Sequence, residues 1–289
     1  MPQKVLPSKK HPFSLDLTVS TLTPTKLKVQ AFDYRKPYSV YYGMVGVVEP
    51  KGRTFNLTFP LSPDQLLVRI FPDMFKTYSE YEKFGTPPQK SINILAAKVG
   101  ALKTTPIWLS EDDREFIRFA EWFSTNASLL SATQADGIPS IYKSDKGKFV
   151  INYHNKIQNK DGSYVSTPAR VGHDTGDIDV SQVDFMGYSI PGRMAILLHE
   201  YCHMFVNERT GLKVSDEIGA DINALNIYLS LGFSPIEAGL VFLKVFETAN
   251  NEYNHKRYLV LRDFMQKFVN GDLKQYYTLL KSKNDIPVG

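Results

Sequence analysis

The sequence has a single cysteine, Cys202, among its 289 residues. This excludes an internal disulfide and a zinc ribbon built from several cysteines. The sequence also has no apolar run of about 18 or more residues, so we expect no membrane-spanning helix and no membrane partner. Lys4, Lys9 and Lys10 are not followed by an apolar segment, so we expect no secretory signal peptide. These absences predict a cytoplasmic protein, or a component of a particle assembled in the cytoplasm.

A large excess of charge is also missing, because 34 basic side chains face 30 acidic ones and the net charge is +4. The most basic stretch, residues 255–283, also contains Asp263 and Asp272. We interpret it as a solvated helix face rather than a nucleic-acid-binding patch. The hydrophobic content of 43% and the aromatic content of 12% exclude a disordered chain. We therefore expect a folded protein that does not bind nucleic acid.

The first hundred residues contain short segments rich in Val, Leu, Phe and Tyr, separated by breaks that contain Pro or Gly. These segments are residues 14–20, 26–33, 39–48, 53–59 and 65–71. In residues 26–31 the apolar side chains occupy every second position, which is typical of a strand with one buried face. The pattern predicts a β-rich domain over residues 1–104, either a sandwich or a barrel. It carries no chemical motif that would indicate its role.

Helical spacing replaces the strand pattern after about residue 104. Residues 112–132 place apolar side chains at helical intervals, and Ser110 can cap this helix. A hairpin over residues 139–153 follows, and the chain is helical in pattern from Ser189 onward. We therefore predict an α+β protein whose second domain spans residues 105–289.

One motif in this second part carries chemistry, the HExxH sequence His199-Glu200-Tyr201-Cys202-His203. Ser189 marks the expected start of its helix and Gly211 the expected end. The two histidines are one helical turn apart, so their imidazoles project from the same side. Tyr201 points into the core, and Glu200 can reach a water on a bound metal without ligating the metal. Two neutral imidazoles at this spacing suit a tetrahedral zinc ion.

A second helix supplies the remaining parts of a zinc site. We expect Ser215 to cap it, and Glu217 and Asp221 lie one turn apart on one of its faces. Glu217 can be the third zinc ligand, and Asp221 can accept the outer N–H of a ligating imidazole and so fix its orientation. Gly219 and Ala220 are small, which allows the two helices to approach closely enough to share one ion.

Residues 199–203 together with Glu217-Ile218-Gly219-Ala220-Asp221 resemble the gluzincin branch of the zincin metallopeptidases. In that family HExxH is followed by a helix with the pattern ExxxD or ExxAD. The hairpin and the helix before the motif are similar to the sheet and helix above the zincin active site. The resemblance covers roughly residues 108–250 and implies a zincin-like domain. It implies these roles: zinc ligands His199, His203 and Glu217, general base Glu200, and supporting carboxylate Asp221.

Weaker signals have ordinary interpretations. We interpret Cys202 as a packing residue, because it flanks the histidine face on the side away from Glu200. The loop around His173 contains three aspartates, and we interpret it as solvated rather than as a metal-binding loop. One interpretation of residues 171–181 is the strand that borders the cleft in zincins and pairs with extended substrate. The family often uses Tyr or His to stabilise an oxyanion, and three candidates stay open: Tyr228, Tyr253 and His255.

These features predict a zinc-dependent hydrolase, a metallopeptidase that cleaves a protein or peptide substrate with a zinc-activated water. Glu200 would take the proton of that water and deliver it to the leaving amine. The alternative is a structural or assembly protein, for example a phage virion component, that retains the zincin fold and its zinc site. In that case the β-rich N-terminal domain binds a protein partner. An assay of turnover separates the two hypotheses.

Overall fold

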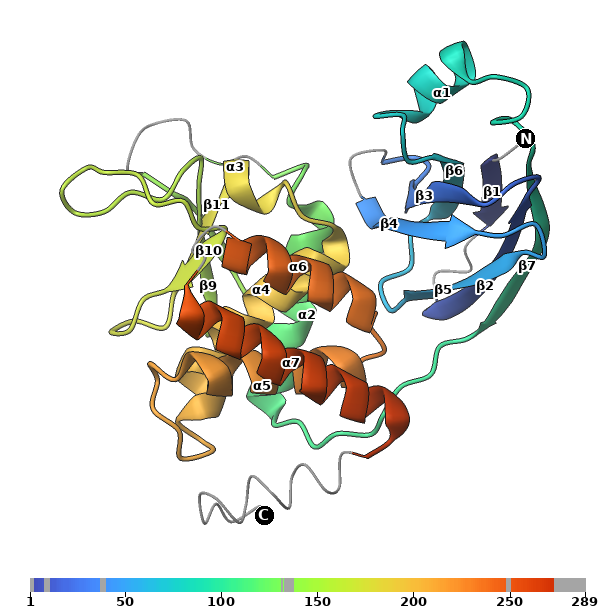
Figure 1. Cartoon of the computed structure of the whole chain (residues 1–289). Helices are drawn as coiled ribbons and strands as arrows, with labels where there is room; N and C mark the ends of the chain where they lie inside the picture. Colours follow the sequence, from blue (N-terminus) through green and yellow to red (C-terminus); the bar gives the residue numbers. More distant parts are fainter. Residues whose placement is uncertain are drawn as a thin grey trace. The chain divides into compact units, whose positions relative to one another are not determined.

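The computed structural model describes residues 3–7, 11–36, 40–130, 132, 138–247 and 251–272. These residues form a mixed α+β structure with two compact units (Figure 1). The first unit consists of Met1–Thr105 and Gly232–Glu237, and the second of Pro106–Leu231 and Ala238–Gly289. That residues 1–104 and 105–289 are separate domains stays a prediction.

The first unit contains two antiparallel sheets with the strand orders β1-β6-β3-β4 and β5-β2-β7. All five predicted strands are confirmed. The sequence did not predict β1, β7 or the short helix α1. The bounds are β1 (Gln3–Pro7), β2 (Phe13–Thr21), β3 (Thr25–Asp33), β4 (Val40–Val48), β5 (Arg53–Phe59), β6 (Gln65–Pro72), α1 (Tyr78–Phe84) and β7 (Ile92–Ala101).

The two sheets of the first unit pack face to face. Alternate side chains of β2 are fully buried, among them Leu15 and Leu17. Tyr42 on β4 packs against Phe59 on β5, with ring centroids 5.4 Å apart, and its hydroxyl donates to the backbone oxygen of Thr58 at 2.5 Å. Because β4 and β5 belong to different sheets, these contacts join the two layers. The unit is therefore a sandwich.

The second unit contains a four-stranded sheet with the order β10-β11-β9-β8, in which β11 and β9 are parallel and the other pairs antiparallel. The predicted hairpin is confirmed as β8 (Ser140–Lys143) and β9 (Val150–His154). The single strand suggested for residues 171–181 is wrong. The chain forms two strands there, β10 (Ala169–Val171) and β11 (Ile178–Ser181), because Gly172 N donates to Asp177 O across a tight turn. This leaves β10 at the edge of the sheet.

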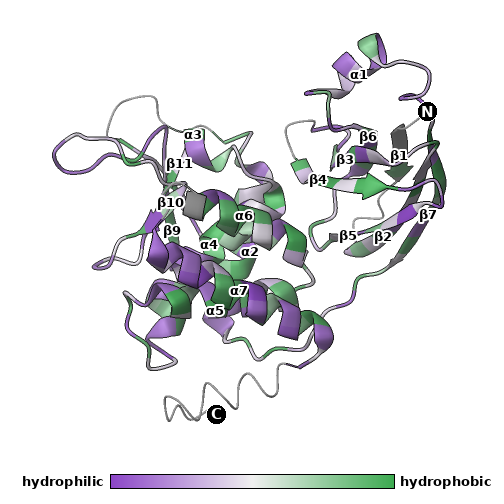
Figure 2. Ribbon diagram, viewed as in Figure 1, coloured by the Kyte–Doolittle hydropathy of each residue, from purple (hydrophilic) through white to green (hydrophobic). Residues whose placement is uncertain are grey.

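Helices make up the rest of the second unit. Ser110 caps α2 as predicted, although α2 ends at Asn126. Helices α4 and α6 are largely hydrophobic, whereas α7 is largely hydrophilic (Figure 2). Among the described residues, no helix is both long and apolar enough to cross a membrane. The bounds are α2 (Glu111–Asn126), α3 (Gln182–Phe185), α4 (Ile190–Tyr201), the π-helix η1 (Cys202–Asn207), α5 (Glu217–Ser230), α6 (Pro235–Glu247) and α7 (Glu252–Asn270).

Helix α4 is the centre of the second unit, because it packs against α2, α5 and β10. Leu197, Leu198 and Tyr201 are fully buried. The ring of Tyr201 stacks on Phe116 of α2 at 4.1 Å, and its hydroxyl donates to Asp113 Oδ1 at 2.6 Å. The prediction that Tyr201 points into the core is confirmed, and this anchoring fixes the opposite face of α4.

Candidate metal centre

The HExxH motif lies where the helix changes type. Ser189 caps the start of the motif helix and Gly211 marks its end, as predicted, but the helix between them is not a single α-helix: α4 ends at Tyr201 and the π-helix η1 follows. Gly211 then ends the helical turns in a Schellman cap: its φ is +76°, its N–H donates to Glu208 O, and Leu212 N donates to Asn207 O. His199 therefore comes from α4 and His203 from η1. π-Helices occur mostly as single turns within α-helices, often at functional sites.

The two imidazoles face each other. His199 Nε2 and His203 Nε2 are 3.0 Å apart, and the rings are nearly perpendicular. His203 Nδ1 lies 2.7 Å from the backbone oxygen of Val214, so this nitrogen carries the proton and donates to that oxygen. Nε2 of His203 then keeps its lone pair and can ligate a metal.

Glu217 at the start of α5 completes a group of three possible ligands. One of its oxygens, Oε2, is 3.5 Å from His199 Nε2, and the other, Oε1, is 3.6 Å from His203 Nε2. A tetrahedral ion with bonds of about 2.0–2.2 Å would place its ligand atoms about 3.3–3.6 Å apart. The two imidazole–carboxylate distances lie in this range and the distance of 3.0 Å between the imidazole nitrogens is slightly shorter, so the side chains of His199, His203 and Glu217 could hold one metal ion.

Asp221 and Arg257 form the outer part of this cluster. Asp221 is fully buried on α5, and its Oδ1 is 2.9 Å from His199 Nδ1. At this distance the Asp221 carboxylate can fix the orientation of the His199 ring. Arg257 on α7 donates to Asp221 through Nε at 2.8 Å and Nη2 at 3.0 Å, and Nη2 also pairs with Glu217 Oε2 at 2.9 Å.

Arg257 corrects the interpretation of residues 255–283 as a solvated face. Its side chain is only 11% exposed and makes three contacts with carboxylate oxygens. Residues 273–289 lie outside the described part of the chain. Arg257 was missed because its partners are about 40 residues away in the sequence, and no periodic pattern links them.

The charges of the cluster shift its pKa values. The hydrogen bond from His199 is the main cause that lowers the pKa of Glu217 to about 2, with further contributions from the charges of His199 and Arg257. Burial lowers the pKa of His199, but Asp221 outweighs it and raises the net value to about 10. Burial raises the pKa of Glu200 above its ordinary value, against the opposing effect of both histidines. The cluster therefore stabilises a charged Glu217, whereas burial favours a protonated Glu200.

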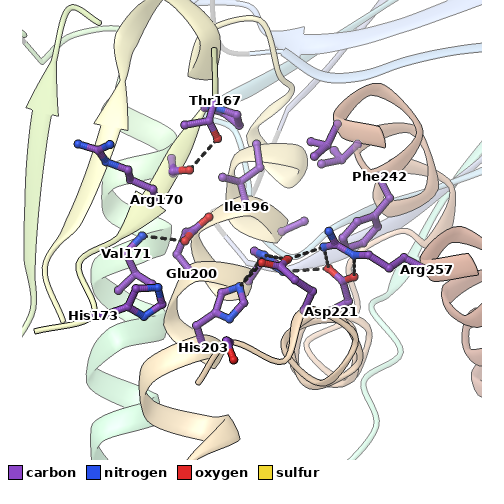
Figure 3. A pocket seen from close by; sticks show the side chains of 18 residues that line it. Thr167, Arg170, Val171, His173, Ile196, Glu200, His203, Asp221, Phe242 and Arg257 are labelled. Atoms are coloured by element: carbon purple, nitrogen blue, oxygen red, sulfur yellow. Dashed lines mark hydrogen bonds and ion pairs between the residues drawn. The ribbon is translucent and has the colours of Figure 1, made fainter. Parts of the chain in front are cut away.

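Glu200 lies beside the three possible ligands and is not one of them. Its Oε2 accepts a hydrogen bond from the backbone N–H of Val171 on β10, at 2.8 Å. Figure 3 shows Glu200 turned toward Val171, with Asp221 and Arg257 on the other side of the same cavity. The strand edge thus fixes the orientation of this carboxylate.

All five predicted site residues line one cavity of about 360 Å³ in the second unit. Its polar side holds the cluster and Glu200, and β10 forms one border. The apolar side comes from α4 and α6 and consists of Ala195, Ile196, Val241, Phe242 and Val245. The sequence did not indicate this apolar side. A cavity of this size and mixed character suits a small part of a larger ligand.

The open candidates for oxyanion stabilisation do not line this cavity. Tyr228 is fully buried, whereas Tyr253 and His255 are exposed on α7. His173 does line it, although the sequence indicated only a solvated loop. Cys202 is buried and its thiol is free, as expected for a packing residue.

The position of Gly219 has little room for a side chain, because α5 lies very close to the end of η1. A Cβ at this position would be 2.6 Å from Leu212 Cδ1 and 3.2 Å from Asn207 Oδ1. We expect Gly219→Ala to cost about 1–3 kcal/mol through overpacking, more than the roughly 0.5–1 kcal/mol that alanine contributes to a helix. Chemical denaturation measures the change. The matched control is Gly239→Ala on α6, where the nearest atom is 3.8 Å away and we expect no loss of stability. Equal stability of the two variants would contradict the close packing.

No model of a known protein family matches the chain, and no curated protein matches it significantly. The site combines three residues that could hold a metal ion, a half-buried carboxylate next to them, and a cavity bordered by a strand edge.

Proposed function

We propose that the protein is a zinc-dependent hydrolase that cleaves peptide bonds. The observation that carries this proposal is the convergence of His199, His203 and Glu217 in one cavity, with Glu200 beside them. The resemblance of HExxH and of the Glu217–Asp221 helix to the gluzincins supports it. The arrangement of α2 and a small sheet around α4 is consistent with a zincin-like domain.

The chemistry of the ligand set favours zinc. Two imidazole nitrogens and one carboxylate oxygen are the ligands of many catalytic zinc sites, which keep the fourth position for water. When bound, zinc polarises a carbonyl oxygen and lowers the pKa of its water to about 7. Asp221 and the Val214 carbonyl hold the two imidazoles in the orientation that ligation requires.

Glu200 is the proposed general base. Its carboxylate is held by Val171 N and lies next to the cluster without being part of it. From this position a carboxylate can accept the proton of the attacking water and return that proton to the leaving amine.

The edge of β10 is the proposed binding site for the peptide backbone. Pro168 and Gly172 make the backbone hydrogen bonds to β11, so Ala169 and Val171 present their N–H and C=O groups to the open edge. Two of these groups already have partners: Val171 N donates to Glu200, and Ala169 O accepts from the Thr167 hydroxyl at 2.9 Å. An extended peptide that adds a strand here exchanges these contacts for its own.

We expect purified protein to contain one zinc per chain and to hydrolyse members of a peptide library. Elemental analysis and mass spectrometry of the library measure the two properties. A chelator should abolish hydrolysis and added Zn²⁺ should restore it, because the metal is part of the reaction. His199→Ala should remove the zinc, whereas His255→Ala on the exposed face of α7 should retain it.

Two results would contradict the proposal. Zinc that is substoichiometric and insensitive to His199→Ala would place the metal elsewhere. Stoichiometric zinc without hydrolysis of any peptide would favour the alternative, an assembly protein that retains the site and binds a partner through its β-rich first unit.

A further inference from the structure

Arg257 joins the two carboxylates that α5 presents to the candidate metal centre. Its Nε and Nη2 bind the two oxygens of Asp221 at 2.8 and 3.0 Å, and Nη2 also lies 2.9 Å from Glu217 Oε2. Arginine suits this position because its donors lie in one rigid plane, which a lysine ammonium does not reproduce. Asp221 is fully buried and the Arg257 side chain is 11% exposed, so solvent screens these contacts little.

These contacts connect the surroundings of His199 and Glu217, two of the three possible metal ligands. Asp221 Oδ1 lies 2.9 Å from His199 Nδ1 and also accepts from Arg257 Nη2, the same nitrogen that pairs with Glu217. A displacement of Arg257 would therefore change the orientation of both His199 and Glu217. Tyr253 covers the guanidinium from outside, with its ring centroid 6.0 Å away.

The two oxygens of Glu217 have different surroundings. Both face an imidazole, Oε2 that of His199 at 3.5 Å and Oε1 that of His203 at 3.6 Å, but only Oε2 is also paired with Arg257, at 2.9 Å. A carboxylate can ligate a metal through one oxygen or through both, and a second oxygen would occupy the position that a catalytic site keeps for water. The pairing of Oε2 with Arg257 favours ligation through Oε1 alone.

We propose that Arg257 is a positioning residue that restricts Glu217 to one-oxygen coordination and thereby keeps a coordination position open for water. This inference rests on the metal site of the proposed function and does not depend on the reaction that the site catalyses. Through Arg257, α7 controls the geometry of the metal centre, although α7 supplies none of the three ligands.

The test uses the full-length protein, stripped of metal and titrated with Co²⁺, whose visible absorption weakens as the coordination number rises. We expect Arg257→Met to lower the affinity for Co²⁺ about 10–100-fold, the usual effect of losing a residue that orients a ligand. At saturation its absorption should be weaker than that of the wild type, because Glu217 can then use both oxygens. Arg257→Lys should restore part of the affinity, since it keeps the charge but loses the planar pair of donors.

The matched control is Arg209→Met, which removes another arginine that pairs with a buried aspartate, Asp113, away from the ligands. Its Co²⁺ spectrum and affinity should equal those of the wild type. Circular dichroism of the metal-free proteins verifies folding, and Arg257→Lys carries the test if the methionine variant does not fold.

The outcomes separate this inference from the proposed function. A spectrum that is unchanged at saturation in both Arg257 variants would overturn the role of Arg257 alone. An altered spectrum without any peptide hydrolysis by the wild type would support the role of Arg257 and contradict the peptidase. Wild-type protein that takes up no Co²⁺ would overturn both.

Discussion

Replacing Glu200 by glutamine should abolish peptide hydrolysis and leave one zinc bound per chain. Glutamine keeps the shape of the side chain and an oxygen that can accept the hydrogen bond from Val171 N. It cannot take a proton from water, and the loss of a general base costs about 10²–10⁴-fold in rate. Because Glu200 is not among the three possible ligands, its replacement should not release the metal. Initial rates with a cleaved peptide and elemental analysis of the same sample measure both effects.

Two variants serve as controls for this experiment. Glu208→Gln changes an exposed glutamate that follows η1 and should alter neither rate nor zinc content. Glu217→Ala should lose zinc and activity together, because it removes a ligand. A Glu200→Gln protein without zinc would make Glu200 a ligand, and one with undiminished hydrolysis would remove its catalytic role.

The parts of the site that the sequence predicted all depend on short-range spacing. Glu217 and Asp221 are one turn apart on α5 and share one of its sides whatever the tertiary fold. His199 and His203 are four residues apart across the junction of α4 and η1, and this short spacing still brings their imidazoles together. Ser110 as a helix cap and the alternating strands of the first unit are local features in the same sense. The cap of α5 was misplaced by one residue: the side chain of Asp216, not Ser215, accepts from Gly219 N.

The parts that the sequence did not predict depend on contacts between distant segments. Arg257 meets Asp221 across 36 positions, and Val171 meets Glu200 across 29. Helical periodicity describes one helix at a time, so it contains no information on these partners.

Replacing Asp113 by alanine should lower the free energy of unfolding by about 3 kcal/mol, because it leaves buried polar groups without their partner. Asp113 is fully buried in the first turn of α2, where its carboxylate accepts hydrogen bonds from Ser110 N, the Tyr201 hydroxyl and Arg209. Tyr201 belongs to the HExxH motif, so the same aspartate completes the capping box of α2 with Ser110 and anchors α4. Denaturant unfolding at neutral pH measures the loss.

The neighbouring Asp112 provides the matched control for this experiment. Its carboxylate pairs with Lys148 at the surface and is 49% exposed, so Asp112→Ala should cost at most about 1 kcal/mol. A similar loss for the two variants would show that Asp113 does not anchor α4.

The effect of Asp113 should also depend on pH. Burial raises the pKa of Asp113, but the hydrogen bonds from Tyr201 and Arg209 outweigh it and lower the pKa below its ordinary value. A group with a lowered folded pKa stabilises the protein above its unfolded pKa, about 4 for aspartate, and loses that effect as the pH falls through the folded pKa. The difference in stability between wild type and Asp113→Ala should therefore shrink below about pH 4. A difference that stays constant on acidification would mean that the loss comes from packing rather than from the charged carboxylate.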